Sequence, residues 1–443
     1  MREALLAACA LAAVAAAPLA AGAQTNERAY EDLDFRFVTP GARAVGMGRS
    51  FIGLADDATA ADSNPAGLSN LEERELAFEV TTTAIRHHRF VGPSDLTTLA
   101  FGEQVWTPSF VSYVLPLGRA TLAAFHNNTQ HHVERFEIGA RDIPPGTVPG
   151  QVAFTEDGTF GRIAIRAGNY GTAGSLIVHR RLAIGGAAAL NVLDLDVSAR
   201  SGWPDRPKNG TDTRAMGAGF KWSAGALVRA AAAVTVGLAY HSRVTHEMTT
   251  TLFGCFADST VPLGRCPTVA GVDRQRDRTG ELRQTDYVIP DRWIGGVSVM
   301  PTPALVIVAD AQYVRYSSRI TDRFQVIDFM TPADGLSRDD FSIRDVTELH
   351  LGAEYRVSTP RHVLAFRAGG FTDPSHALRF TPRPATPRHE NLEFRFNRVP
   401  PRTDVGLTVG FGMTFWNRLQ TDVAVSRIRS ATDVVMSFVT RFP

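Results

Sequence analysis

The sequence has few cysteines, almost no net charge and no long apolar run after its N-terminus. Its 443 residues include 3 cysteines, and 46 Lys and Arg nearly balance 45 Asp and Glu, which leaves a formal charge of +1. So small a charge gives no electrostatic reason to expect nucleic acid as a partner. After residue 23, no stretch approaches the roughly 18 uninterrupted apolar residues of a membrane helix. A membrane β-barrel is not excluded, because its strands alternate and keep moderate hydropathy.

The N-terminus has the features of an export signal. A basic residue precedes the apolar run from Ala4 to Ala21, and Ala21-Gly22-Ala23 has the small-x-small pattern of a signal peptidase site. We predict that residues 1–23 are a cleaved signal peptide. A membrane anchor and lipidation at Cys9 are the alternatives, but the run is short, mostly Ala, and continues past Cys9.

Export leaves Cys255 and Cys266 as the cysteines of the mature chain. Two cysteines close together in an exported protein predict a disulfide that staples a loop. Two reduced thiols are the alternative.

The stretch from Pro40 to Leu71 is small, Gly- and Ala-rich, and has neither strand alternation nor a helical apolar stripe. Its glycines do not form a phosphate-binding loop, because no strand precedes them and no P-loop lysine follows. We expect a short helical turn over Ala55–Ala61, with Asp56 and Asp57 capping it or pairing with Arg43 or Arg49. Asn64-Pro65 marks a turn.

From Arg74 onward the sequence alternates between apolar and polar residues, as β-strands do. In Leu193-Asp194-Leu195-Asp196-Val197, apolar side chains point one way and carboxylates the other. Connections alternate between short turns and long polar loops, which is typical of an outer-membrane barrel with short periplasmic turns and long extracellular loops. The count of candidate strands is about 14, each roughly 10 to 18 residues long, with both termini periplasmic. We predict an all-β transmembrane antiparallel barrel over residues 74–443, and an N-terminal segment and lumenal hatch over residues 24–73. A barrel of this width would be an aqueous pore unless a compact segment such as Pro40–Leu71 closed it.

Several segments resemble the FadL family of outer-membrane transporters for long-chain fatty acids and other hydrophobic compounds. GARAVGMG (41–48) and LADDATAADSNPAGLS (54–69) are similar to its hatch, and Asn64-Pro65-Ala66 matches the family's Asn-Pro-Ala motif. DYVIPDRWIGGVSVMPTPALVIVADAQYVRYS (286–317), LHLGAEYRV (349–357) and FRAGGFTDPS (366–375) are similar to its late strands. The resemblance implies a 14-stranded barrel with a hatch.

The resemblance also implies which residues act. In the hatch it assigns gating to Asn64, Pro65 and Ala66, together with Gly46, Gly48 and Arg49. Arg49 departs from the small residue common at its position, and we expect it to meet a carboxylate or to pair with Asp56 or Asp57. A plain structural turn is the alternative for the Asn-Pro-Ala motif.

The family's lateral exit lies at a kinked third strand. Here that strand covers about Arg119–Phe136, and its polar middle, His126, Asn127 and Asn128, is the candidate gap. An ordinary strand end in solvent is the alternative.

These features together predict a non-enzymatic, passive transporter of hydrophobic molecules in the bacterial outer membrane. No Ser/His/Asp or paired-carboxylate constellation stands out, so catalytic residues are not expected, and neither is a cofactor or a nucleic-acid partner. A metal site is not expected, since the two residues of each pair, His87-His88 and His131-His132, point to opposite faces of a strand. The expected partners are long-chain fatty acids or hydrocarbons, outer-membrane lipid and lipopolysaccharide, and the barrel-insertion machinery, with the chain acting as a monomer. The alternatives are a scaffold or shuttle in secretion and a barrel enzyme.

Overall fold

The computed structural model describes residues 37–85, 99–102, 106–138, 141–143, 154–156, 159–203, 206–254, 283–324, 338–381, 397, 400–429 and 431–442. The predicted signal peptide and the predicted Cys255–Cys266 disulfide lie outside these residues, as do His87 and His88. Within the described residues no helix is both long and apolar enough to cross a membrane.

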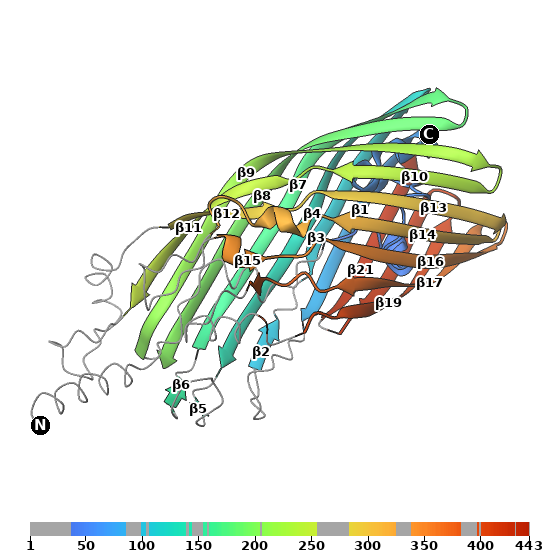
Figure 1. Ribbon diagram of the computed structural model, residues 1–443. Helices are drawn as coiled ribbons and strands as arrows, with labels where there is room; N and C mark the ends of the chain where they lie inside the picture. Colours follow the sequence, from blue (N-terminus) through green and yellow to red (C-terminus); the bar gives the residue numbers. More distant parts are fainter. Residues whose placement is uncertain are drawn as a thin grey trace, which may run out of the picture.

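The described chain is a barrel of antiparallel strands (Figure 1). The wall is formed by β1 (Arg74–Ile85), β2 (Leu99–Gly102), β3 (Thr107–Leu117), β4 (Ala120–Ile138), β7 (Thr159–His179), β8 (Leu182–Trp203), β9 (Arg206–Ala231), β10 (Val234–His241), β11 (Val244–Gly254), β12 (Arg283–Ile289), β13 (Arg292–Thr302), β14 (Leu305–Val314), β16 (Val346–Ser358), β17 (His362–Pro374), β19 (Thr403–Phe415), β20 (Leu419–Arg427) and β21 (Ala431–Phe442). Short pairs join β5 (Arg141–Ile143) to β6 (Phe154–Glu156) and β15 (Phe341–Ser342) to β18 (Arg379–Phe380).

The sheet closes on itself, because β21 pairs with β1 from Arg74–Phe442 to Ile85–Ala431. Three wall strands are built from two segments each: β2 with β3, β10 with β11, and β12 with β13. The seventeen segments therefore make a closed barrel of 14 strands, which confirms the predicted fold. Closure removes the exposed sheet edges that would otherwise pair with other chains.

The predicted alternation of connections is visible in the structure. Short turns join the strands at one end, which we call the turn end, and the strands that enter or leave the long connections end at the other, the loop end (Figure 1). The strands reach farther than expected, since β8 has 22 residues and β9 has 26. The reason is that these strands continue past the apolar band of the barrel toward the loop end.

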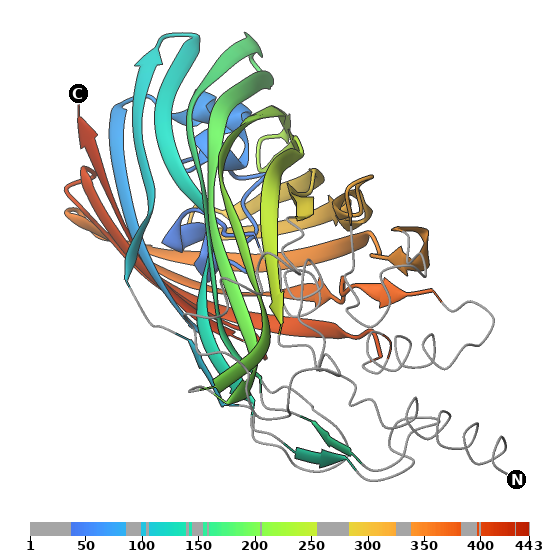
Figure 2. The same cartoon turned by 90° about the vertical axis from the view of Figure 1, so that its left-hand side faces the viewer.

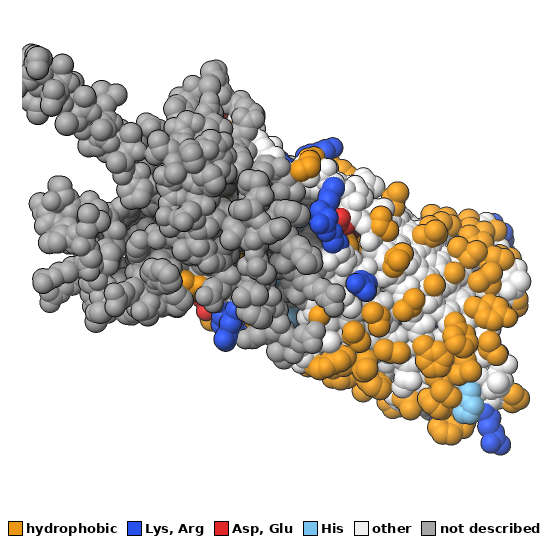
Figure 3. Space-filling view, turned by 90° about the horizontal axis from the view of Figure 1, so that it is seen from below, with side chains coloured by type: hydrophobic (Ala, Val, Ile, Leu, Met, Phe, Trp, Pro, Cys, Tyr) orange, Lys and Arg blue, Asp and Glu red, His pale blue; other side chains and the backbone are white. Residues whose placement is uncertain are grey.

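Apolar side chains cover the outside of the barrel near its turn end. The face in Figure 3 shows them over that half, with Lys and Arg where the band ends. Aromatic side chains cluster on this outer surface: the ring of Tyr240 lies 5.0 Å from that of Trp222 and 4.5 Å from that of Trp293, centroid to centroid. An apolar band with aromatic residues on its outer face is typical of a membrane barrel.

Residues 37–73 fold inside the barrel, and we call this segment the hatch (blue in Figure 2). It contains helices α3 (Ala42–Gly46) and α4 (Ala60–Ser63) and the 3₁₀ helix η1 (Pro65–Asn70). The expected turn over Ala55–Ala61 is wrong in position. Ala55 has a φ of 34°, which breaks a right-handed helix, so the helix begins only at Ala60.

Candidate functional site

Glycines of the wall receive the hatch. A side chain at Gly237 would collide with the carbonyl of Ile52, one at Gly352 with the carbonyl of Met47, and one at Gly185 with the backbone of Pro65 and Ala66. Backbone therefore packs directly against backbone where the hatch meets the barrel, which only glycine allows.

The predicted gating glycines lie at this junction. Gly48 has a φ of 68°, and a side chain there would collide with the carbonyl of Leu351. Its N–H donates to the hydroxyl of Thr408 (2.8 Å), and that hydroxyl in turn donates to the carbonyl of Gly46 (3.1 Å). The two glycines thus dock the first turn of the hatch on β19.

Arg49 pairs with a wall carboxylate and not with Asp56 or Asp57. Its guanidinium lies 2.6 Å from Asp433 and donates to Ser426 (3.2 Å), and it packs over the ring of Phe371 at 4.6 Å. Of the two expectations for Arg49, contact with some other carboxylate or pairing with Asp56 or Asp57, the geometry supports the first, and the carboxylate belongs to the barrel wall. Arg49 therefore ties the hatch to the last two strands.

Asn64 closes the predicted Asn-Pro-Ala turn. Its side chain is fully buried, accepts from the N–H of Ala66 (3.3 Å) and donates to the carbonyls of Ile52 (3.0 Å) and Ala226 (3.4 Å). Pro65 occupies the first position of η1 and Ala66 is fully buried. The motif thus joins two parts of the hatch to β9.

A buried ion network holds the other side of the hatch. Arg43 contacts Asp56 (2.6 Å) within the hatch and Glu354 (2.9 Å) on β16, and Glu354 also pairs with Arg367 (2.6 Å), which contacts Asp422 (2.7 Å). Burial lowers the pKa of Arg43, but the neighbouring carboxylates raise it further, so the net shift is upward. The guanidinium stays charged, and the hatch is fixed by ions that water does not screen.

A row of amides surrounds Asp62 of α4. Its carboxylate accepts from Asn127 of β4 (2.9 Å) and Asn169 of β7 (3.1 Å). Asn191 of β8 donates to Asn169 (2.7 Å), and His246 of β11 lies 2.8 Å from Asn191. We call these five side chains the polar belt. It connects the hatch with four strands of the wall.

The predicted gap residues divide between the two faces of β4. Asn127 points inward to Asp62, whereas His126 stacks on Tyr170 (4.3 Å) and Asn128 donates to the carbonyl of Pro108 (2.7 Å). Register with β7 shifts between Asn128 and Gln130, which is a β-bulge at the predicted position. Pairing of β4 with β3 also ends at Asn127.

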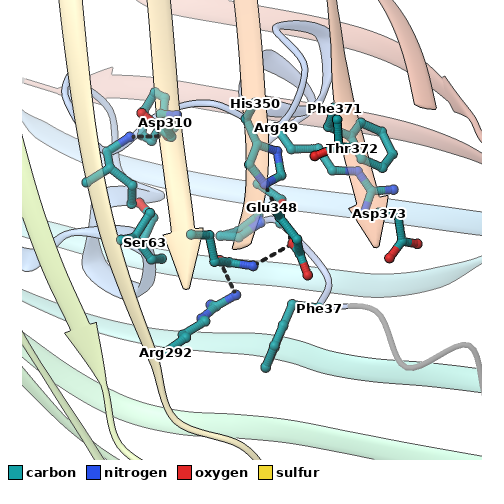
Figure 4. Close-up of a pocket in the computed structure, with 16 residues that line it drawn as sticks. Phe37, Arg49, Ser63, Arg292, Asp310, Glu348, His350, Phe371, Thr372 and Asp373 are labelled. Carbon is teal, nitrogen blue, oxygen red and sulfur yellow. Dashed lines mark hydrogen bonds and ion pairs between the residues drawn. The ribbon is translucent and has the colours of Figure 1, made fainter. Parts of the chain in front are cut away.

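A cavity lies between the hatch and the wall (Figure 4). Its polar side chains engage one another or the hatch: Arg292 donates to Gln312 (3.2 Å), Gln312 to Glu348 (2.8 Å), and Asp310 accepts from the N–H of Phe51 (2.6 Å). The guanidinium of Arg292 also lies 4.1 Å from the ring centroid of Phe37. The cavity is therefore lined by polar side chains that already have partners.

Toward the loop end the lumen is mainly apolar, although some buried polar side chains such as Gln130 and Thr250 also face it. Inward side chains of β7, β8, β11 and β12 form one buried cluster with residues of the connections: Ile163, Ile165, Leu193, Leu195, Val197, Val244, Met248, Tyr287, Ile289, Phe341, Leu378 and Phe380 among others. The same strands carry charge on their outer face, where Arg166 and Asp194 are half exposed and 3.5 Å apart. Polarity is thus inverted beyond the membrane band, with apolar side chains inside and ions outside.

Sequence reasoning missed the wall partners of the hatch. Glu354, Arg367 and Asp422 are inward ionisable residues in strands whose other face meets lipid. Their signal in the sequence is an ionisable residue within an alternating strand. Among the described residues, no three His, Cys, Asp or Glu side chains form a metal-binding group.

Comparison with known proteins gives a consistent family and fold. Residues 208–438 match the model of the family described as outer membrane protein transport protein (OMPP1/FadL/TodX). No curated protein matches the sequence.

Solved structures share the fold at low identity. The toluene transporter TbuX of Ralstonia pickettii is 16% identical, with a TM-score of 0.60 over 93% of this chain and 100% of that one. A FadL homologue from Pseudomonas aeruginosa is 15% identical, with a TM-score of 0.58 over 95% and 99%. The CymD monoaromatic hydrocarbon channel is 15% identical, with a TM-score of 0.57 over 92% and 99%.

Proposed function

The chain belongs to the outer membrane protein transport protein family (OMPP1/FadL/TodX), and we propose that it takes up hydrophobic molecules passively across the outer membrane. The proposed cargo is a long-chain fatty acid or a hydrocarbon. Transport is driven by diffusion and involves no catalytic step.

The apolar lumen at the loop end is the observation that carries this proposal. Leu193, Leu195 and Val197 face the lumen, while Asp194 and Asp196 face outward. A water-filled porin has the opposite pattern, with a polar lumen. Apolar cargo that replaces contacts inside this cluster gains about 0.8 kcal/mol for each buried methylene.

The hatch excludes a straight aqueous route. It is held by the Arg43–Glu354 pair, by Arg49–Asp433 and by the polar belt, and its backbone packs against wall glycines. We propose that cargo does not displace it and leaves sideways through the wall. The family resemblance predicts that exit at His126–Asn128 of β4.

Uptake of labelled toluene and of a labelled long-chain fatty acid tests the proposal, in cells that lack their own transporter. Leu195→Asn should lower uptake at least tenfold, because it puts an unpaired amide into the apolar cluster. Asp194→Asn, on the outer face of the same strand, is the matched control and should leave uptake unchanged. Equal uptake by the two variants would contradict a lumenal route.

Asn64→Ala tests the coupling of the hatch to transport. The substitution leaves the carbonyl of Ile52 without its side-chain donor, which costs about 1–3 kcal/mol for a buried group. We expect uptake to fall while the barrel still inserts and shows heat-modifiable migration in a gel. Unchanged uptake would indicate that the motif is only a structural turn.

A scaffold or shuttle role in secretion is the alternative function. It requires an apolar surface on the outer loops, and most residues of these loops lie outside the described part of the chain. A correctly inserted barrel that takes up neither compound would favour this role.

A further inference from the structure

The turn end of the barrel carries mostly positive charge on its surface. Its exposed cations are seven arginines, which we call the arginine ring: Arg74, Arg119, Arg180, Arg181, Arg229, Arg361 and Arg418. Within the described part of the chain, the exposed acidic residues of the same end are Glu72 and Glu73. Because the whole chain has a formal charge of only +1, the excess of positive charge is a property of this end and not of the protein as a whole.

Two other arginines of this end are neutralised by buried carboxylates of the chain. Arg356 lies 2.6 Å from Glu354, and Arg441 lies 2.8 Å from Glu75. No carboxylate of the described residues forms such an ion pair with a member of the arginine ring. The charge of the ring is therefore available to an anion outside the chain.

The arginine ring surrounds the rim of the barrel, because its members stand in or beside successive turns. Backbone hydrogen bonds join neighbouring turns, with the carbonyl of a ring member as the acceptor in four of them: Ile177 N–H to Arg119 (2.8 Å), Arg229 N–H to Arg181 (2.9 Å), Trp416 N–H to Arg361 (2.9 Å) and Arg441 N–H to Arg418 (2.8 Å). Among the described turns of this end, the one between β13 and β14 lacks an arginine. The positive charge thus runs around the barrel and is not gathered on one side.

The arginine ring adjoins the apolar band. Exposed apolar side chains stand within two residues of five ring members: Leu76, Leu117, Val178, Val228 and Trp416. On the face shown in Figure 3, Lys or Arg side chains lie at the turn-end edge of the band. The stem of an arginine can pack along apolar surface while its guanidinium stays in water, which places the ring at the depth of lipid head groups. Tryptophan, here Trp416 with 67% of its surface exposed, is also enriched at that depth.

A phosphate group is the anion that these side chains fit. A guanidinium presents paired N–H donors that match two phosphate oxygens, and the ring contains arginine without lysine. Short turns of an outer-membrane barrel face the periplasm, so the head groups at this depth belong to the periplasmic leaflet. Lipid molecules surround a barrel on all sides, whereas an acidic protein would dock on one side. The distribution of the arginines around the rim therefore favours lipid over protein.

We propose that the arginine ring binds an annulus of anionic glycerophospholipids in the periplasmic leaflet, with their phosphates against the guanidinium groups and their acyl chains on the apolar band. The annulus fixes the depth of the turn end in the leaflet. This inference is independent of the proposed transport function, because it requires only that the barrel lies in the outer membrane.

The lipid selectivity of the purified full-length barrel tests the proposal. The barrel is reconstituted in phosphatidylcholine bilayers with a trace of spin-labelled phosphatidylglycerol or of spin-labelled phosphatidylcholine. The motionally restricted fraction of each label gives the ratio of the two association constants. We expect phosphatidylglycerol to associate at least threefold more strongly at low salt, and the preference to weaken in about 1 M salt, where charges are screened.

Variants of the ring assign the preference to its arginines. Substitution of all seven by Gln should abolish the preference, and Arg180→Gln with Arg181→Gln should lower it. The matched control is Arg166→Gln with Arg214→Gln, which changes the total charge by the same amount at the loop end, where these arginines pair with Asp194 (3.5 Å) and Asp196 (3.7 Å). The control should lose less of the preference than the double variant of the ring.

Equal association of both lipids with the unmodified barrel would overturn the annulus and would point to an acidic periplasmic protein as the occupant of the ring. A preference that survives loss of all seven arginines, in a barrel that shows heat-modifiable migration, would overturn it as well. An equal loss in the two double variants would mean that total charge, and not the ring, attracts the lipid. If the sevenfold variant does not fold, the salt dependence of the unmodified barrel and the two double variants decide.

Discussion

At the scale of single residues, the hatch is held mainly by groups that are far apart in sequence. Arg43 and Glu354 are 311 positions apart, yet they are joined by two hydrogen bonds of 2.9 and 3.1 Å. Pairs of this kind are weak evidence for net stability, since burial of ions is costly, but removal of one partner leaves an uncompensated charge.

Arg43→Ala should therefore destabilise the barrel by about 3–5 kcal/mol and loosen the hatch. Glu354 keeps Arg356 and Arg367, but Asp56 and Asp57 lose their cation. The measurement is the urea concentration at which heat-modifiable migration disappears. Arg166→Ala, which removes a half-exposed pair with Asp194, is the control and should cost less than about 1 kcal/mol. An equal loss in both variants would contradict a special role for the buried network.

Of the residues that make these contacts, those in the hatch could be predicted from the sequence better than their partners in the barrel wall. Asn64, Gly48 and Arg49 stand in a compact stretch whose composition separates it from strands. Their partners Ala226, Thr408 and Asp433 lie in ordinary strands. The alternation of a strand predicts which face of the sheet such residues occupy. It does not predict which atom of the hatch they contact, because that depends on how the barrel closes around the hatch.

At the scale of elements, the wall strands pack closely against the hatch at positions where the wall has glycine and therefore no side chain. Gly295 and Gly296 are neighbours on β13 with opposite surroundings: a side chain at Gly295 has nothing within 4 Å, whereas one at Gly296 would meet Asp310 and the N–H of Gly53 at 2.8 Å. Asp310 cannot move away freely, since it accepts from the N–H groups of Phe51 and Ile52.

Gly296→Ala should consequently unseat this part of the hatch, and Gly295→Ala should not. Protease cleavage within the hatch, followed by mass spectrometry of purified barrels, measures the difference. We expect cleavage at least tenfold faster for Gly296→Ala than for Gly295→Ala. Equal rates would mean that the wall glycines do not position the hatch.

The strands were predictable from the alternation of apolar and polar residues, and the closed barrel from the alternation of short and long connections. The first strand, β1, begins at Arg74, where the sequence pattern predicts the start of alternating strands. The helical turn was misplaced because the sequence does not reveal the positive φ of Ala55.

At the scale of the whole molecule, the barrel has two different lumenal halves. The half toward the turn end is closed by charge pairs and backbone contacts of the hatch. The half toward the loop end is filled by apolar side chains, although the same strands are charged outside. We propose that a molecule with this division admits apolar cargo and blocks water, which is the central claim of the proposed function.

A series of alkylbenzenes tests that claim most directly: benzene, toluene, ethylbenzene and propylbenzene, each labelled and supplied at low concentration to cells with this barrel as their transporter. Each added methylene buried in the lumen contributes about 0.8 kcal/mol, so uptake should rise about fourfold per carbon until the cargo outgrows the lumen. Uptake that instead falls steadily with size, as in an aqueous pore, would contradict a hydrophobic route through the barrel.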